Sequence, residues 1–148
     1  QPNTCTIANG FAAMGIALPG AIAAKLVFPE RKVIAVNGDG GFLMNSQELE
    51  TAKRMKTAFP TVVWKDGRYG VIELNQTRRF GRTFGVEFSN PDFVQYAQSF
   101  GLPAYRVESA DDLLPTLKRA LELDQPSLIE VPVDYRENLH LAERLGVQ

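Results

Sequence analysis

Short apolar runs alternate along the chain with longer segments whose apolar residues recur at helical spacing. The runs are short, rich in β-branched residues and bounded by charged residues, glycine or proline. They cover residues 33–36, 61–64 and 128–131, with a weaker fourth at 105–107. Continuous apolar runs of this length are typical of strands buried on both faces of a parallel sheet. The pattern therefore predicts four parallel strands.

The segments between these runs carry the signals of helix starts. A polar residue that can accept a backbone hydrogen bond precedes each apolar periodic stretch, with an acidic residue three positions later or a proline at the first turn. The pairs are Asn45 with Glu48, Asn90 with Pro91, and Ser109 with Asp112. A further helix is predicted over residues 11–27, where Ala and Gly are frequent and would suit close packing.

Helix follows strand three times in this order, which predicts an α/β fold with an open, mostly parallel sheet and helices on both faces. In such folds ligands bind beyond the carboxyl ends of the strands. The length of 148 residues is that of one domain, so we expect residues 1–148 to form a single unit.

Composition excludes several classes of function. The net charge of −1 provides no general attraction for nucleic acid or an anionic membrane. One cysteine, Cys5, and one histidine, His140, cannot form a disulfide framework or a histidine metal cluster. The uncharged stretch 4–24 is interrupted by glycine and proline and lacks the basic start of a signal peptide, so we expect a cytoplasmic protein without a membrane partner.

The sequence Gly38-Asp39-Gly40-Gly41 comes directly after the first predicted strand and its Asn37. Glycines at this point let the backbone turn sharply and approach a ligand, so that main-chain N–H groups can face a phosphate. Mg²⁺ is commonly held by one or two carboxylates together with phosphate oxygens, which suits Asp39. The same residues are also compatible with an ordinary tight turn between a strand and a helix.

A second carboxylate follows the next predicted strand. Residues 41–64 are enough for one helix and one strand, and Asp66 stands just after them. If the two strands are neighbours, Asp39 and Asp66 lie at the same edge of the sheet. Two carboxylates placed there repel each other unless a cation lies between them.

This arrangement resembles the C-terminal, diphosphate-binding domain of thiamine-diphosphate-dependent enzymes, closest to catabolic acetolactate synthase. The family motif begins with Gly-Asp-Gly and ends in Asn-Asn about two dozen residues later. Residues 38–40 match its start in full, and Lys65 and Asp66 stand at its end. Asp at the second place occurs in catabolic acetolactate synthases. The flanking segments 11–21, 41–52 and 131–135 extend the resemblance over nearly the whole chain.

The resemblance implies thiamine diphosphate and Mg²⁺ as cofactors and assigns residues to them. Mg²⁺ would be held by the side chains of Asp39 and Asp66 and by the backbone carbonyl of Arg68. Gly38, Gly40 and Gly41 would pass close to the diphosphate. Met14 would support the bent conformation of the cofactor, although without the resemblance it would be interpreted as an ordinary core methionine.

The segment 69–84 would line the substrate side of the site by the same resemblance. Val71 and Asn75 are the positions expected to affect substrate choice. The cluster Arg78, Arg79 and Arg82 could attract an anionic 2-oxo acid, or could be a solvated helix end.

The implied reaction is decarboxylation of pyruvate and condensation of the two-carbon unit with a second 2-oxo acid. We expect no catalytic residue in this chain, because the activating glutamate of the family lies in an N-terminal pyrimidine-binding domain of the same or a partner chain. The chain would correspond to the last of three domains, inactive alone, in a homo-oligomer. Two alternatives are a decarboxylase of another 2-oxo acid and a non-catalytic scaffold, in which Lys65 would pair with Asp39 or Asp66 in place of a cation.

Overall fold

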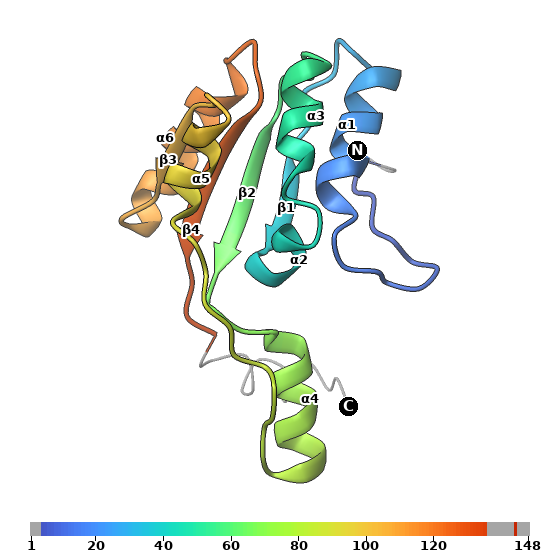
Figure 1. The fold of residues 1–148 in the computed structure, drawn as a ribbon, viewed down its shortest axis with the longest axis vertical. Coiled ribbons are helices and arrows are strands. Elements are labelled where there is room, and N and C mark those ends of the chain that lie inside the picture. The colour runs from blue at the N-terminus through green and yellow to red at the C-terminus, as the bar shows by residue number, and fades with distance from the viewer. Residues whose placement is uncertain (1–3, 136–143, 145–148) are drawn as a thin grey trace.

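The computed structural model describes residues 4–135 and 144, and its centre is a four-stranded sheet (Figure 1). The strands are β1 (Ala35–Gly38), β2 (Pro60–Lys65), β3 (Ala104–Arg106) and β4 (Ser127–Pro132). All neighbouring strands are parallel, in the order β1-β2-β4-β3. The predicted α/β class and parallel sheet are confirmed.

Helices cover both faces of the sheet. On one face, the major core contains residues of the helices α1 (Ala17–Val27), α2 (Asp39–Leu43), α3 (Glu48–Arg54) and α5 (Phe93–Ser99). On the other face, α6 (Ala110–Leu121) packs on β2 and β4 through a smaller apolar cluster. Among the described residues, none of the helices has the length and apolar content needed to cross a membrane.

The register of β1 and β2 determines where the candidate site lies. Gly38 at the end of β1 pairs with Trp64 near the end of β2. Asp39 follows β1 at once, and Asp66 follows β2 at once. The first strand runs to Gly38 rather than ending at 36, because its pairing with β2 extends from Ala35 to Gly38.

The helix α4 (Gly70–Phe80) projects away from the sheet beyond the carboxyl ends of the strands (Figure 1). None of the residues of α4 is buried. Two backbone hydrogen bonds join the chain before the helix to the chain after it, from Tyr69 N–H to the Val86 carbonyl (2.9 Å) and from Phe88 N–H to the Gly67 carbonyl (3.0 Å). We call the segment from Gly70 to Gly85 the arm, and these paired segments its neck.

The first helix is shorter than predicted. It begins at Ala17 rather than at residue 11, and Phe11 is fully exposed. Ala12 has a φ of 49° and Gly15 a φ of 86°, both in the left-handed region, which interrupts a right-handed helix. The segment before α1 is therefore a loop.

The predicted cap at Asn45 is wrong. The helix α3 begins at Glu48, after Gln47, without a side-chain cap. The Asn45 side chain instead donates to the carbonyl of Gly15 at 3.0 Å, thirty residues earlier in the sequence. The short α2 was not predicted, because Gly40 and Gly41 are poor helix formers.

The helix predicted after Asn90 exists as α5, but its cap is Asp92 rather than Asn90. The Asp92 carboxylate accepts from Gln95 N–H at 2.9 Å. The capping box of Ser109 and Asp112 is confirmed at the start of α6.

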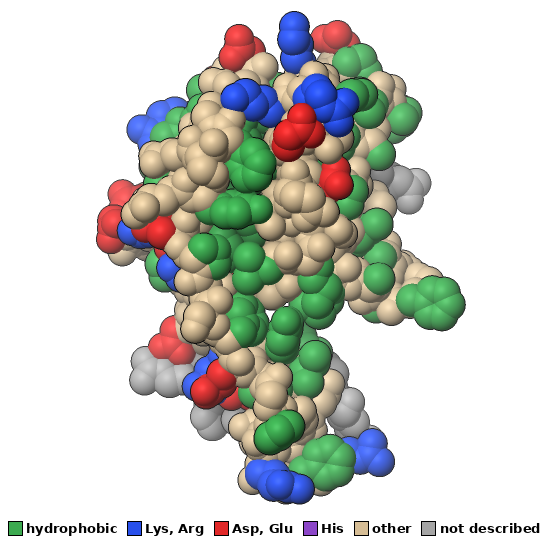
Figure 2. Space-filling model, in the orientation of Figure 1, with side chains coloured by type: hydrophobic (Ala, Val, Ile, Leu, Met, Phe, Trp, Pro, Cys, Tyr) green, Lys and Arg blue, Asp and Glu red, His purple; other side chains and the backbone are tan. Residues whose placement is uncertain are grey.

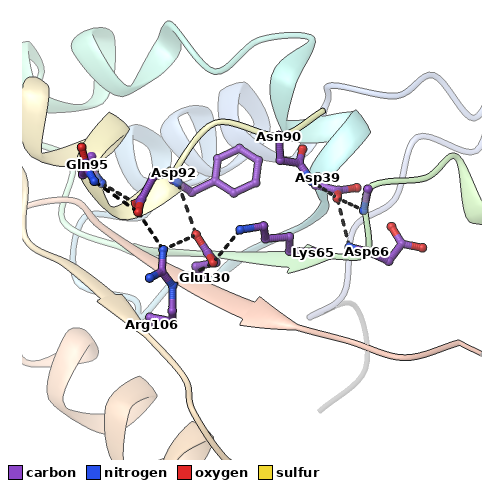
Figure 3. A network of polar contacts seen from close by, with 10 residues as sticks. Asp39, Lys65, Asp66, Asn90, Asp92, Gln95, Arg106 and Glu130 are labelled. Atoms are coloured by element: carbon purple, nitrogen blue, oxygen red, sulfur yellow. Dashed lines mark hydrogen bonds and ion pairs between the residues drawn. The ribbon is translucent and has the colours of Figure 1, made fainter. Parts of the chain in front are cut away.

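An ion network around one buried carboxylate joins three strands (Figure 3). Glu130 of β4 is 1% exposed, and its carboxylate accepts from Lys65 Nζ of β2 (3.0 Å) and from Arg106 Nε of β3 (2.9 Å). It also accepts from Phe93 N–H (3.3 Å), the first residue of α5, and Arg106 reaches Asp92 (3.0 Å). Burial acts to raise the pKa of Glu130, but the hydrogen bonds and charges of Arg106 and Lys65 outweigh it and hold that pKa below its usual value.

Glu130→Gln is expected to lower the free energy of unfolding at pH 7 by about 2 kcal/mol, because it removes the charge that two cations contact. The pKa of Glu130 is lower in the folded protein than its usual value of 4.5. The contribution of its charge to the free energy of unfolding is therefore fully present above that pH and is lost as the pH falls through the folded pKa. Urea unfolding of both proteins from pH 7 to pH 3 should therefore show their difference shrinking. A matched Glu122→Gln control, at an exposed pair with Lys32, should change stability little. A difference independent of pH would contradict this account.

Candidate functional site

Asp39 is the centre of the polar contacts at the carboxyl edge of the sheet (Figure 3). It is 1% exposed. Its Oδ1 accepts from Gly40 N–H at 2.8 Å. Its Oδ2 accepts from three donors: Asp66 N–H (3.0 Å), Gly67 N–H (2.7 Å) and Asn90 Nδ2 (2.6 Å). The carboxylate is therefore held by the loop after β2 as well as by its own turn.

Asp66 lies next to Asp39, as parallel pairing of β1 and β2 requires. Burial raises the pKa of the Asp66 carboxyl, and the nearby Asp39 carboxylate raises it further, while the hydrogen bond from Arg68 N–H (3.2 Å) acts in the opposite direction. The two acids thus influence each other electrostatically. A cation placed between them would relieve that repulsion.

The side chain of Arg68 points to the arm rather than to the two acids. Its guanidinium pairs with Glu73 of α4 and, at 2.7 Å, with Glu87 of the neck. The predicted role of Arg68 rests on its backbone carbonyl, and that role stays a prediction.

The glycines of the turn differ in what surrounds them. A Cβ on Gly40 would lie 2.5 Å from the ring of Tyr69 and 3.2 Å from that of Phe88, so aromatic packing requires glycine there. A Cβ on Gly38 would meet nothing within 4 Å, and its φ of −73° suits any residue. A Cβ on Gly41 would meet only ordinary contacts, the closest at 3.9 Å. Protein packing therefore explains glycine at 40 but not at 38.

Met14 lies beside this turn. A Cβ on Gly41 would be 4.0 Å from the Met14 methyl group, and the Met14 side chain is 43% exposed. The hydrogen bond from Asn45 to Gly15 holds this loop in place. A methionine exposed to this extent is not an ordinary core residue. Its role in supporting the cofactor stays a prediction.

Val71 and Asn75 lie one turn apart on α4, and both are exposed. A hollow at the far end of the arm does not include them; it is lined by Gln76, Phe80, Arg82, Thr83 and Phe84. The Arg79 guanidinium stands over the Phe80 ring at 5.5 Å. The roles of Val71 and Asn75 in substrate choice stay predictions. His140 and most of the polar tail lie outside the described residues.

Sequence reasoning missed Asn90 as a site residue. It interpreted Asn90 as a helix cap, and only the return of the chain from the arm brings it to Asp39. Tyr135 was missed too: burial raises the pKa of its hydroxyl, and the carboxylates of Asp66 and Asp39 raise it further. Neither residue has a local sequence signal.

The donor set suits a hard divalent cation that takes oxygen ligands. Within the described residues, no group of three or more His, Cys, Asp or Glu side chains could hold an ion. Two carboxylates beside an open glycine turn fit Mg²⁺, which keeps several water or phosphate ligands. They do not fit structural zinc, which takes four protein ligands.

Comparison with known families agrees with this geometry. The family described as "Thiamine pyrophosphate enzyme, C-terminal TPP binding domain" matches residues 1–131. The chain belongs to this family. The resemblance seen in the sequence is thus confirmed.

Similar members of the family include two bacterial proteins. An acetolactate synthase of Bacillus subtilis (strain 168) is 46% identical over 142 residues, which cover 96% of this chain and 25% of that protein. A catabolic acetolactate synthase of Raoultella terrigena is 46% identical over 145 residues, which cover 94% of this chain and 26% of that protein. The chain spans about a quarter of the length of these relatives.

A solved structure has the same fold as this chain over most of its length. The thiamine diphosphate-dependent 4-hydroxybenzoylformate decarboxylase of Rhodococcus jostii RHA1 matches with a TM-score of 0.78 and 32% identity. The match covers 84% of this chain and 24% of the decarboxylase.

Gly40→Ala is expected to lower the free energy of unfolding by about 1–3 kcal/mol, because the added methyl group overlaps the Tyr69 ring. Gly38→Ala, with open space around it, should leave stability unchanged or raise it by up to about 1 kcal/mol. Urea unfolding measures both. The loss at Gly40 should be much smaller in a Tyr69→Ala background, and an equal loss in both backgrounds would refute the clash.

Proposed function

We propose that this chain binds thiamine diphosphate through a Mg²⁺ ion held by Asp39 and Asp66, as the diphosphate-binding part of an acetolactate synthase-like carboligase. One observation carries the proposal. A buried carboxylate and a second, electrostatically coupled carboxylate meet at adjacent strand ends, next to a glycine whose side-chain space is open. This is where α/β proteins bind phosphorylated ligands.

Mg²⁺ fits these residues for electrostatic reasons. Its charge would favour the ionised form of Asp66, against the burial and repulsion that raise the pKa of that carboxyl. Phosphate oxygens and water would complete an octahedral shell, since Mg²⁺ rarely takes all its ligands from protein. The backbone carbonyl of Arg68 would be a further ligand. The uncrowded backbone at Gly38 leaves room for the diphosphate.

Thiamine diphosphate supplies the electron sink for decarboxylating a 2-oxo acid such as pyruvate. The residues of this chain bind and align the cofactor. Met14, exposed beside Gly41, would pack against its apolar part. Val71 and Asn75 would face the substrate from the arm.

The rest of the site would come from another domain. The activating glutamate belongs to a pyrimidine-binding domain, of the same chain or a partner, in this proposal. Figure 2 shows apolar and basic side chains at the far end of the arm. Val71 and Phe84 are 74% and 86% exposed, and apolar surface of this kind is commonly covered by a partner. A homo-oligomer would provide one.

A decarboxylase of another 2-oxo acid is the second candidate. The structural match to a 4-hydroxybenzoylformate decarboxylase favours it. The Mg²⁺ and diphosphate residues would be the same in both cases, and the difference would lie in the residues around the substrate.

The non-catalytic alternative loses its main support. It required the Lys65 ammonium to neutralise Asp39 or Asp66. The Lys65 Nζ is 3.0 Å from Glu130 Oε1, and within the described part of the chain it makes no hydrogen bond or ion pair with either aspartate. Lys65 therefore does not neutralise either acid, and in this proposal a cation from solution would do so.

Calorimetry of the chain with thiamine diphosphate should show binding that requires Mg²⁺. Asp39→Ala is expected to abolish it, because the variant removes the buried ligand oxygens. Gly38→Ala should weaken binding of the cofactor while the protein stays folded, because its methyl group enters the open space. Binding that persists unchanged without Mg²⁺, or in Asp39→Ala, would refute the metal assignment.

Product analysis should distinguish the carboligase from the decarboxylase. The chain joined to its pyrimidine-binding domain and supplied with pyruvate, thiamine diphosphate and Mg²⁺ is expected to form acetolactate, detected by mass spectrometry. Release of acetaldehyde alone would favour the second candidate. The Asp39→Ala variant should form neither product, which controls for the uncatalysed reaction.

A further inference from the structure

The contact between Asn90 and Asp39 is the shortest that the Asp39 carboxylate makes. Asn90 Nδ2 donates to Asp39 Oδ2 at 2.6 Å across 51 residues of sequence (Figure 3). The other end of the same amide is unsatisfied: Asn90 Oδ1 is buried and has no hydrogen-bond partner. A buried acceptor without a partner lowers stability. The helix that follows does not need Asn90 either, because Asp92 caps it.

The hydrogen bonds are divided unequally between the two oxygens of Asp39. Oδ2 accepts from three donors, Asp66 N–H, Gly67 N–H and Asn90 Nδ2, whereas Oδ1 accepts from Gly40 N–H alone. An ionised carboxylate has about four lone-pair directions, two on each oxygen. Oδ2 is therefore fully used by the protein. Oδ1 keeps the capacity to accept a further partner.

We propose that Asn90 is a positioning residue, which fixes Asp39 Oδ2 as the oxygen bound by protein and so leaves Oδ1 as the oxygen offered to the cation. The inference rests on the proposed function for the identity of that cation. The two backbone donors on Oδ2 belong to the loop after β2, and Asn90 adds a third from the segment that returns from the arm. Without Asn90, only the two backbone donors hold Oδ2, and the orientation of the carboxylate is fixed less firmly.

The placement of Asn90 itself depends on contacts on both sides of it. Phe88 N–H binds the Gly67 carbonyl at 3.0 Å on one side, and Asp92 binds Arg106 at 3.0 Å on the other. The segment between these contacts passes over the carboxyl end of the sheet. Asn90 thus reaches Asp39 from a segment that is fixed independently, as a positioning residue should.

The experiment compares Asn90→Leu, which keeps the branched shape of the side chain but removes the amide, with the matched control Gln95→Leu. Gln95 is exposed, its amide lies 3.4 Å from Asp92, and no hydrogen bond among the described residues joins it to Asp39. Calorimetry of the full chain with Mg²⁺ and saturating thiamine diphosphate is the main readout. Asn90→Leu is expected to weaken Mg²⁺ binding about tenfold, the lower end of the effect of residues that orient a metal ligand. Gln95→Leu should leave the Mg²⁺ affinity within about twofold.

A second readout needs no ligand. A double-mutant cycle of Asn90→Leu and Asp39→Ala in urea, without Mg²⁺, is expected to give a coupling of about tenfold in the unfolding equilibrium constant. Unchanged Mg²⁺ affinity in Asn90→Leu, or a cycle without coupling, would overturn the inference. If the unaltered chain takes up no Mg²⁺, the proposed function fails, and the cycle still decides whether Asn90 holds Asp39.

Discussion

The structure around the carboxyl edge of the sheet depends on one buried charge that is satisfied almost entirely by backbone. Asp39 is at the end of β1, and the N–H groups of the loop after β2 point to it. Burying a carboxylate costs several kcal/mol unless hydrogen bonds compensate it. The compensation here requires the two strands, the loop and the returning segment to be in place together. Folding therefore produces the candidate site and the local fold as one event.

Glu130 has a similar role on β4, which is two strands away from β1 in the sheet. Its carboxylate joins β4 to β2 and β3 through the side chains of Lys65 and Arg106, and to the start of α5 through the backbone N–H of Phe93. Lys65 belongs to this network, although it stands within the family motif. A residue at a motif position can thus serve the sheet instead of the ligand, and only its partner in space shows which it serves.

The sequence was sufficient for those features that follow from local patterns and from the geometry of parallel strands. Four apolar runs became four strands, and the ends of consecutive runs brought Asp39 and Asp66 to one edge. It was not sufficient where a polar side chain had a choice of partners. Asn45 and Asn90 both precede helices and look like caps, yet each binds a residue at least thirty positions away. Local patterns do not encode such choices, because tertiary contacts decide them.

The neck of the arm has a consequence for how a protein of this kind can diversify. The two hydrogen bonds at Gly67 and Val86 join the segments that enter and leave the arm, and beyond them no side chain of α4 is buried. Gly70 contacts Asp66 and Glu73 pairs with Arg68, but the rest of α4 can be substituted without removing a buried side chain. Selection can therefore alter the exposed surface of the arm while the glycine turn at Asp39 stays the same. One scaffold can acquire new specificities in this way and still fold.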